Sequence, residues 1–181
     1  MNHSTDNVTL YALFVNEILN IYQDKKEPLY EPFFTITQGY DLSDPFNKVP
    51  IKLYNDICKW LEQELGPANL KKAGMQIAET LYQTLTNARS LPASPAPIDL
   101  INGLVYAADT MIQDPEGRGL QVLDARPNAI LLRRTQTFNS TLQLGLLRGM
   151  VQKAGVRMVE VSYAKSVAQG DEYDDYLITW T

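Results

Sequence analysis

The spacing of apolar residues changes once along this chain, after Asp114, and this change limits the possible folds more than any other feature. Before Asp114, apolar residues recur every three or four positions, as in helices that bury one side. After it, apolar and polar residues alternate, as in strands with one buried face. The chain is therefore expected to place its helices first and most of its strands last.

Four helices are predicted in the first part of the chain. The first follows an apolar stripe over Leu10–Ile21, and the second begins just after Pro50 and stops at Gly66-Pro67. The other two are expected at residues 68–89 and 98–112. Prolines and glycines in residues 22–49 indicate a surface connector, with a short strand at Phe33–Thr37.

The last third predicts a sheet interrupted by one helix. The expected elements, in order, are strands Leu120–Ala125 and Ala129–Thr135, helix Phe138–Ala154, and strands Val156–Ala164 and Tyr173–Trp180. The natural solution is an α+β fold in which N-terminal helices pack on a C-terminal four-stranded antiparallel sheet, with strand-strand-helix-strand-strand order. The length suits a single domain over residues 1–181.

Composition excludes several classes of protein. The net charge of -5 argues against a nucleic-acid partner, because phosphate binding depends on clustered Lys and Arg. The single cysteine, Cys58, cannot form an internal disulfide and is interpreted as a buried core thiol. No segment resembles a signal peptide, and none is apolar enough to span a membrane. We therefore expect a cytoplasmic protein.

The chain offers few groups for catalysis or metal binding. Its single histidine, His3, lies in a polar tail, so neither a Cys/His zinc site nor a nucleophile-histidine pair can be assembled. The glycine-rich patterns that bind phosphates or dinucleotides are also missing. The glycines in Asp114–Gly119 follow a helix and precede a strand, which favours a tight turn over an anion site. We predict no enzyme activity, no catalytic residue and no metal site.

Four carboxylates crowd into five positions near the C-terminus: Asp171, Glu172, Asp174 and Asp175. They do not follow the ligand spacing of a helix-loop-helix calcium site. Acid-base catalysis would need a buried carboxyl tuned by its surroundings, whereas acids at a hairpin turn are expected to be hydrated. We interpret the cluster as a solvated hairpin, with incidental divalent-cation binding as the alternative.

Two further groups of residues could serve a close contact or a ligand. Gly145 and Gly149 would let the predicted helix approach a neighbouring backbone or a bulky ligand, unless they reflect ordinary packing on the sheet. Four arginines gather around the first predicted hairpin and could bind an anion, unless they are scattered surface charge. These are Arg118, Arg126, Arg133 and Arg134.

The stretch Gly117–Trp180 resembles small-molecule-binding domains related to 4-vinyl protochlorophyllide reductase accessory proteins. The matching parts are the strand pair, the glycine-bearing helix, and the ending in which Ala168-Gln169-Gly170-Asp171 joins two strands. Those domains share a fold with heme nitric-oxide-binding (H-NOX) sensors and with subunits of the TRAPP vesicle-tethering complex. The resemblance implies a ligand-binding or signalling domain with an apolar channel between helices and sheet, and a dimer interface.

The resemblance also identifies what this chain lacks. H-NOX sensors hold heme iron with a helix histidine and the propionates with a Tyr-x-Ser-x-Arg motif; this chain has only His3 and no such motif. Histidine-ligated heme is therefore not expected, which leaves Tyr106 or Cys58 as axial ligands and the cofactor unassigned. The cysteines that mark a metal site in the vinyl-reductase group are replaced by Ser166 before the turn and Asp174 after it.

We therefore expect a non-enzymatic small-molecule-binding or signalling module with an apolar pocket between helices and sheet. Its expected partners are an apolar small molecule and a second copy of the chain. Two alternatives stay open: a dimeric interaction protein with a filled core, and a heme or tetrapyrrole binder without a histidine ligand. The residues expected to line the pocket are Trp60, Tyr106, Met111, Phe138 and Leu142.

Overall fold

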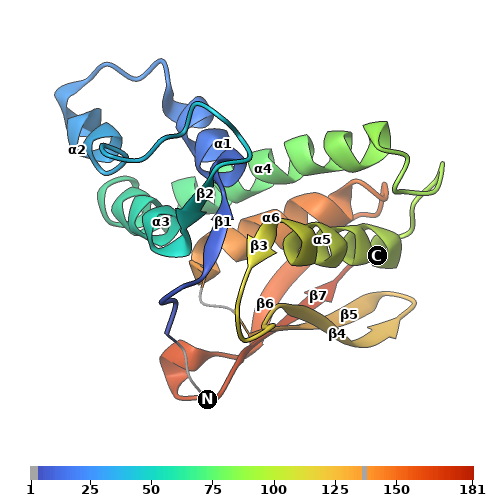
Figure 1. The fold of residues 1–181 in the computed structure, drawn as a ribbon. Helices are drawn as coiled ribbons and strands as arrows, with labels where there is room; N and C mark the ends of the chain where they lie inside the picture. Colours follow the sequence, from blue (N-terminus) through green and yellow to red (C-terminus); the bar gives the residue numbers. More distant parts are fainter. Residues whose placement is uncertain (1–3, 136–137) are drawn as a thin grey trace.

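The protein has an α+β fold in which helices cover one face of a C-terminal sheet (Figure 1). The computed structural model describes residues 4–135 and 138–181. The sheet has the antiparallel order β4-β5-β7-β6. Its strands are β4 (Leu120–Arg126), β5 (Ala129–Arg134), β6 (Glu160–Lys165) and β7 (Asp174–Thr179), and α6 (Ser140–Gln152) joins the two hairpins. The predicted fold class and the strand-strand-helix-strand-strand order of the C-terminal part are confirmed.

Prolines mark the starts of several helices in the first part, and a glycine ends one of them. They are α1 (Ala12–Tyr22), α2 (Glu31–Thr35), α3 (Ile51–Leu65), α4 (Pro67–Asn87) and α5 (Pro97–Met111). Helix α3 stops at Gly66, whose φ of 84° suits glycine, and Pro67 starts α4 as its first residue. The Asp99 carboxylate accepts a hydrogen bond of 2.9 Å from the Ala96 amide and so fixes the start of α5.

The connector before α3 differs from the prediction. Residues Glu31–Thr35 form helix α2, preceded by the short 3-10 helix η1 (Pro28–Tyr30), so the strand expected at Phe33–Thr37 is wrong. A single helical turn directs Phe33 inward, where it is fully buried. Its ring lies 5.4 Å from that of Trp60. Strands and short helices both bury large aromatic residues, so the apolar residues of this segment do not distinguish a strand from a short helix.

A second, smaller sheet was not predicted. Strands β1 (Thr9–Tyr11), β2 (Lys48–Pro50) and β3 (Ile112–Gln113) pair antiparallel in the order β2-β1-β3. Strands of two or three residues are too short to show an alternating pattern, and their partners lie far away in the sequence. The pairing makes the first helix begin at Ala12 instead of Leu10.

The observed bounds of the later elements also differ from the predicted bounds by a few residues. Helix α6 begins at Ser140, because the Asn139 side chain caps it by accepting 3.0 Å from the Leu142 amide. Strand β6 begins at Glu160 instead of residue 156, after Gly155 and Met158 adopt φ values of 75° and 50°. The 3-10 helix η2 (Val167–Gln169) and Gly170, at φ 97°, form the turn before β7.

Helix α6 lies between α4 and the sheet (Figure 1). A Cβ atom placed on Gly145 would overlap the Lys71 carbonyl group of α4, and one on Gly149 would come within 2.6 Å of the Ala78 Cβ. Gly74 of α4 meets the backbone of α6 in the same way. The glycine pair therefore serves a close approach between two helices.

Strand β7 alternates as its sequence predicts. Tyr176, Ile178 and Trp180 are buried toward the helices, whereas Leu177 is exposed on the opposite face. Cys58 is fully buried in α3, which confirms a core thiol, and burial raises the pKa of that thiol. A buried, protonated thiol is a poor nucleophile and a poor metal ligand.

Candidate functional site

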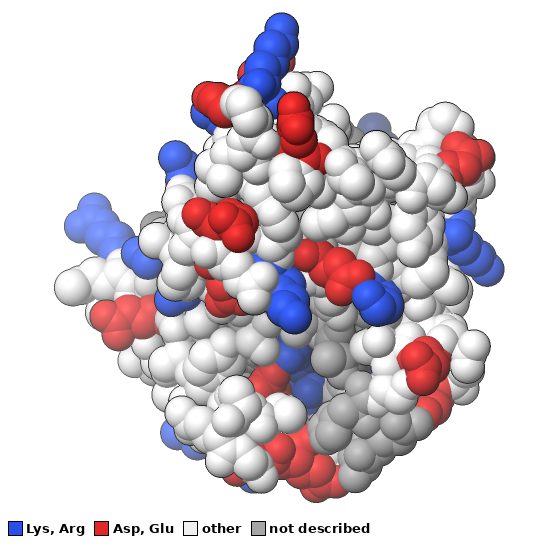
Figure 2. Space-filling model, turned by 90° about the vertical axis from the view of Figure 1, so that its left-hand side faces the viewer, with Lys and Arg blue, Asp and Glu red and all other residues white. Residues whose placement is uncertain are grey.

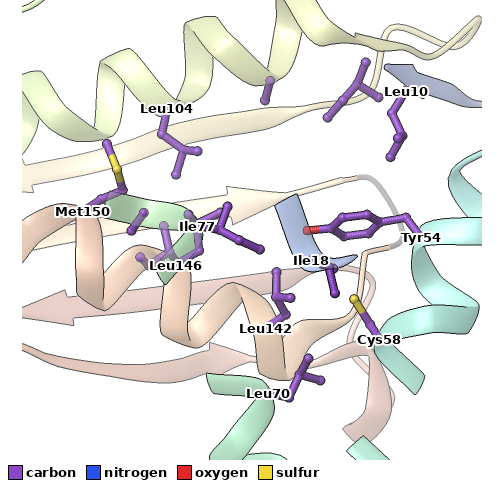
Figure 3. Packing of buried hydrophobic residues seen from close by; sticks show 14 of the residues in the cluster. Leu10, Ile18, Tyr54, Cys58, Leu70, Ile77, Leu104, Leu142, Leu146 and Met150 are labelled. Atoms are coloured by element: carbon purple, nitrogen blue, oxygen red, sulfur yellow. The ribbon is translucent and has the colours of Figure 1, made fainter. Parts of the chain in front are cut away.

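A cavity lies between the helices and strands β4 and β5. Its volume is about 100 Å³. In Figure 3, side chains from different helices converge on this region from opposite sides: Tyr54 of α3, Ile77 of α4, Leu104 of α5, and Leu142 and Leu146 of α6. Most of the remaining lining is also apolar, and burial raises the pKa of the Tyr54 hydroxyl. The site is suited to an apolar guest.

The polar groups of the cavity lining are few: Glu17, Thr80, Thr84, Arg134 and Gln143, besides the Tyr54 hydroxyl. The first three lie on α1 and α4, Arg134 ends strand β5, and Gln143 lies in the first half of α6. Among the described residues of the lining there is no His, Cys, Lys or Ser. An apolar wall with a few placed polar groups is typical of a binding pocket.

Three of the five predicted pocket residues line this cavity: Met111, Phe138 and Leu142. The ring of Phe138 packs edge-on against that of Tyr54 at 5.7 Å. Contact of these side chains with a ligand stays a prediction.

The other two predicted residues lie elsewhere. Trp60 packs on Phe33 and on Tyr30, whose ring is 6.0 Å away, and Tyr106 is 65% exposed. Helical geometry explains this, because a residue six positions after Tyr54 is rotated by about 240° around the helix axis. Similarly, Tyr106 follows the cavity residue Leu104 by two positions, a rotation of about 200°.

Arg134 is the cavity residue with the most polar contacts. It is 6% exposed and pairs with Asp174, which lies directly opposite it on β7. Its Nη1 donates to the Phe138 carbonyl, and its Nη2 donates to the Ser140 hydroxyl at 2.9 Å. Its Nε has no hydrogen-bond partner among the described residues. The sequence did carry a signal for its burial: Arg134 follows Ile130 and Leu132 at every second position of β5, so all three lie on the same buried face.

Gln143 is a second buried polar residue of the lining, and the sequence analysis did not predict it for the pocket. It is 5% exposed, and its Nε2 also lacks a hydrogen-bond partner among the described residues. Buried donors without an acceptor cost roughly 1–3 kcal/mol each, so native proteins satisfy nearly all of them. Both residues belong to the cavity lining, but neither of these nitrogens is exposed within the cavity.

The acidic cluster near the C-terminus is not the solvated hairpin that the sequence suggests. Asp174 and Asp175 are each 2% exposed. In the register of β5 and β7, Arg133 faces Asp175 and Arg134 faces Asp174. The first pair is bidentate, with N–O distances of 2.8 and 2.9 Å. The prediction was wrong for these two acids because pairing with β5 supplies each with an arginine that no local pattern reveals.

Asp174 accepts several hydrogen bonds in addition to the ion pair. Burial raises its pKa, but the Arg134 charge, the Val167 amide at 2.9 Å and the Ser140 hydroxyl at 3.0 Å lower it, and the pKa lies below its ordinary value. The carboxylate is therefore charged at neutral pH. It holds the Arg134 guanidinium at the edge of the cavity.

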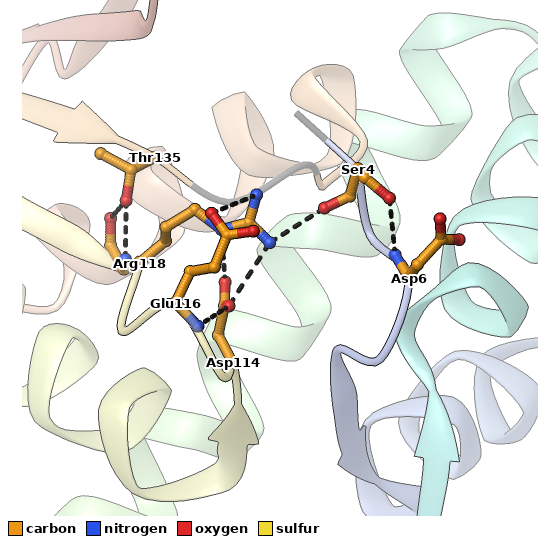
Figure 4. A network of polar contacts seen from close by, with 7 residues as sticks. Ser4, Asp6, Asp114, Glu116, Arg118 and Thr135 are labelled. Atoms are coloured by element: carbon orange, nitrogen blue, oxygen red, sulfur yellow. Dashed lines mark hydrogen bonds and ion pairs between the residues drawn. The ribbon is translucent and has the colours of Figure 1, made fainter. Parts of the chain in front are cut away.

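All four arginines of the predicted cluster pair with carboxylates. Besides the two pairs on β5, Arg126 binds Asp124 at 2.7 Å on the surface. Arg118 binds Asp114 at 2.8 Å and donates to the Ser4 carbonyl, so that it ties the N-terminal segment to the turn before β4 (Figure 4). The expected tight turn is confirmed there, and the positive charge available to an anion is small.

One face of the molecule has mixed charge. On the face shown in Figure 2, acidic and basic residues are interspersed. Within residues 4–135 and 138–181, no group of three or more His, Cys, Asp and Glu could hold a metal ion. No helix in that part of the chain is long and apolar enough to cross a bilayer.

The fold matches solved H-NOX proteins. An H-NOX protein from S. oneidensis in the Fe(II)NO ligation state has a TM-score of 0.73 and 13% identity, covering 95% of this chain and 99% of that one. The Fe(II) unliganded H-NOX protein from K. algicida has a TM-score of 0.67 and 10% identity, covering 95% and 97%. A structure obtained to probe heme distortion in the H-NOX family has a TM-score of 0.65 and 14% identity, covering 95% of each chain.

No protein-family model and no curated protein sequence matches the chain. Identities of 10–14% establish the fold alone. The H-NOX part of the predicted resemblance is thus confirmed at the level of fold. The kinship with 4-vinyl reductase accessory domains and with TRAPP subunits stays a prediction.

Proposed function

We propose that this chain is a non-enzymatic ligand-binding domain of the sensor type, which holds a small apolar molecule between its helices and sheet. The observation that supports it most is the apolar cavity of about 100 Å³. Protein interiors are close-packed, with few voids larger than a water molecule. A pocket of this size, partly open to solvent and lined by side chains of several helices, is better explained by a guest than by a filled core.

The cavity volume indicates the size of the guest. An apolar cavity of about 150 Å³ lined by Leu, Ile and Phe stays dry and binds benzene. The cavity of this protein suits a guest of similar size, one aromatic ring or a short alkyl chain. Burial of the apolar surface of the guest, at about 25 cal/mol per Å², would supply most of the binding free energy.

A heme or tetrapyrrole without a histidine ligand is the second candidate. The solved neighbours favour it, because they include H-NOX proteins in Fe(II) and Fe(II)NO ligation states. The residues of this chain do not fit histidine-ligated heme, since its one histidine is His3, outside the described residues. Neither of the substitute ligands, Tyr106 and Cys58, lines the cavity. Drug-sized ligands occupy pockets of about 300–1,000 Å³, so a tetrapyrrole would require this cavity to expand.

The cavity lining supports a binding role over catalysis. A nucleophile with a hydrogen-bonded general base would be needed for covalent chemistry, and the lining supplies Thr hydroxyls without a histidine or lysine beside them. Glu17 is the one carboxylate of the lining. We therefore place no catalytic residue in the site.

Three further parts of the proposal rest on the sequence. They are a single domain over residues 1–181, a homodimer in the cytoplasm, and kinship with the vinyl-reductase accessory domains. Sedimentation velocity on the purified chain measures the dimer directly. A monomer at every concentration would remove the dimer and leave the cavity proposal unchanged.

Ala107→Leu tests the proposed function by filling the cavity. Ala107 is a buried lining residue of α5, so the added methyl groups would occupy the guest volume. We expect the affinity for α-methylstyrene, a probe of one substituted ring, to fall by about tenfold or more, as for the loss of a well-packed apolar contact. Isothermal titration calorimetry measures the affinity.

Ala68→Leu is the matched control, because Ala68 is exposed in the first turn of α4. It should bind the probe as the unchanged protein does. If the unchanged protein does not bind the probe, or if Ala107→Leu binds it equally well, the apolar cavity is not a ligand site. A stoichiometric Soret band after hemin titration would favour the second candidate instead.

A further inference from the structure

Among the described residues, Glu17 is the one carboxylate that lines the proposed binding cavity, and it indicates what kind of guest the cavity takes. We propose that the guest carries a protonated amine that pairs with the Glu17 carboxylate, while the apolar part of the guest fills the cavity. This inference rests on the proposed function and narrows the guest to aromatic or alkyl amines with a single positive charge.

Glu17 lies on the side of α1 that faces the cavity. It follows Leu13 by four positions and Phe14 by three, and all three residues belong to the lining. Residues at these spacings are neighbours on one side of a helix, with Cβ atoms about 5–6 Å apart. Glu17 is half-buried, which places it where the cavity meets solvent and not in its fully enclosed part.

The charge of Glu17 acts on the interior of the cavity. The ring of Tyr54 is buried and extends from α3 with its hydroxyl group toward Ile77, another residue of the lining (Figure 3). Burial is the main reason that the pKa of this hydroxyl is raised, and the negative charge of Glu17 raises it further. Neighbouring charges shift a pKa over short distances, so the Glu17 carboxylate lies in the neighbourhood of the Tyr54 hydroxyl.

The carboxylate of Glu17 is not compensated by a cation of the protein. The ion pairs among the described residues do not include Glu17. Arg134 is the one cation in the described part of the lining, and its charge is already offset by Asp174. A positive group on the guest would supply the missing partner of Glu17, whereas a carboxylate guest would meet a like charge.

Three aromatic rings of the lining also favour a cation. Phe14, Tyr54 and Phe138 line the cavity, and the ring of Tyr54 lies edge-on to the other two, at 6.3 and 5.7 Å. The face of an aromatic ring is negative and attracts an ammonium group within about 6 Å of the ring centre. Phe14 is one helical turn from Glu17, so an amine that pairs with this carboxylate would lie close to the Phe14 ring.

Three probes share one ring and differ in charge: benzylamine, ethylbenzene and phenylacetate. Benzylamine is protonated at neutral pH, and ethylbenzene has a methyl group of similar size in place of the ammonium group. We expect benzylamine to bind about tenfold or more tightly than phenylacetate in isothermal titration calorimetry, because Glu17 attracts the first and repels the second. Added salt should weaken the binding of benzylamine but not that of ethylbenzene, since salt screens partly exposed charges.

Glu17→Gln removes the charge and keeps the size of the side chain. It should lower the affinity for benzylamine by about fivefold or more and leave the affinity for ethylbenzene unchanged. Glu64→Gln makes the same change at an exposed position of α3 and should alter neither affinity. Ala107→Leu should weaken both probes, because the ring of each would lose the same volume. If Glu17→Gln does not fold, the salt dependence and the comparison of probes on the unchanged protein still decide.

The outcomes distinguish this inference from the proposed function. Equal affinities for benzylamine and phenylacetate, or an unchanged affinity for benzylamine in Glu17→Gln, would overturn the amine inference, while binding of ethylbenzene would keep the apolar site. Benzylamine binding that Ala107→Leu does not weaken would place the amine outside the cavity and overturn the inference too. Failure of all three probes to bind would overturn the proposed function as well.

Discussion

Arg134 connects the sheet to the start of α6 through the terminal nitrogens of one side chain. These nitrogens bind Asp174 of β7, the Phe138 carbonyl and the Ser140 hydroxyl. The ion pair is buried, so the attraction between its charges must offset the loss of hydration of both. Removal of one partner would leave the other charged and unpaired in the interior.

Asp174→Asn should therefore destabilise the protein by about 3–5 kcal/mol at neutral pH. Urea unfolding followed by circular dichroism measures this loss. Asp124→Asn is the control, because it removes the carboxylate of the exposed ion pair with Arg126. Its effect should stay within about 1 kcal/mol, the usual range for a surface pair.

The same ion pair predicts how stability depends on pH. The pKa of Asp174 is lower in the folded protein than its ordinary value. The carboxylate therefore contributes stability above the unfolded-state pKa of about 3.9, and that contribution is lost as pH falls through the folded pKa. The difference between the unchanged protein and Asp174→Asn should be constant from about pH 5 to 8 and should shrink below about pH 4. A difference that grows in acid would contradict the assignment.

At the scale of elements, the contact between α4 and α6 depends on backbone approaching backbone. Gly145 faces the Lys71 carbonyl group, and Gly74 faces the backbone at Leu142 and Leu146. Backbone atoms cannot move aside as the end of a flexible side chain can. These two helices also carry Ile77, Leu142 and Gln143 of the cavity, so their spacing sets one of its walls.

Gly145→Ala should destabilise the protein by about 1–3 kcal/mol, the usual cost of overpacking. In an exposed helix the same change would stabilise by about 0.5–1 kcal/mol, because alanine is the better helix former. A decrease in the free energy of unfolding, instead of an increase, would therefore show that the two helices are in close contact at Gly145. Arg148→Ala, at an exposed position of α6, is the control and should change the free energy of unfolding by less than about 0.5 kcal/mol. A stabilised Gly145→Ala protein would show that the helices are farther apart.

At the scale of the whole molecule, the guest would contact elements from most of the chain. The lining includes Phe14 of α1, Tyr54 of α3, Leu104 of α5, and residues of α4, α6 and the sheet. Because the cavity exists only when these elements are assembled, a guest binds the folded state and not the unfolded chain. Binding must then stabilise the fold as a unit.

At 100 times its dissociation constant, α-methylstyrene should raise the free energy of unfolding by about 2.7 kcal/mol. Differential scanning calorimetry should show one transition that moves to higher temperature as the probe concentration rises. In Ala107→Leu, the transition should not respond to the probe. An equal shift in that variant would place the binding outside the cavity.

The sequence predicted those parts of the fold that depend on neighbours along the chain. The period of apolar residues gave helices α3, α4 and α5 close to their observed ends, because Pro50, Gly66 and Pro67 mark the limits locally. It failed for α2 and for the sheet β2-β1-β3, which are too short for any period to be visible.

For the candidate site, the sequence identified apolar residues but not their partners. Met111, Phe138 and Leu142 were predicted for the pocket and line it, whereas Trp60 and Tyr106 lie on other sides of their helices. The last two are large aromatic residues on helices, and residue type alone does not say which way a side chain points. Of the polar residues in the lining, Arg134 was predicted only as part of a possible anion-binding cluster, and Gln143 was not predicted for the pocket.

The sequence by itself determined the order of the longer helices and strands and much of their buried faces, because both follow from local periodicity. Only the tertiary structure decided that Asp174 and Asp175 are buried, since the register of β5 and β7 sets an arginine opposite each. It also decided that a cavity remains between the layers. The volume of a void depends on how side chains from distant segments meet, and no single segment carries that information.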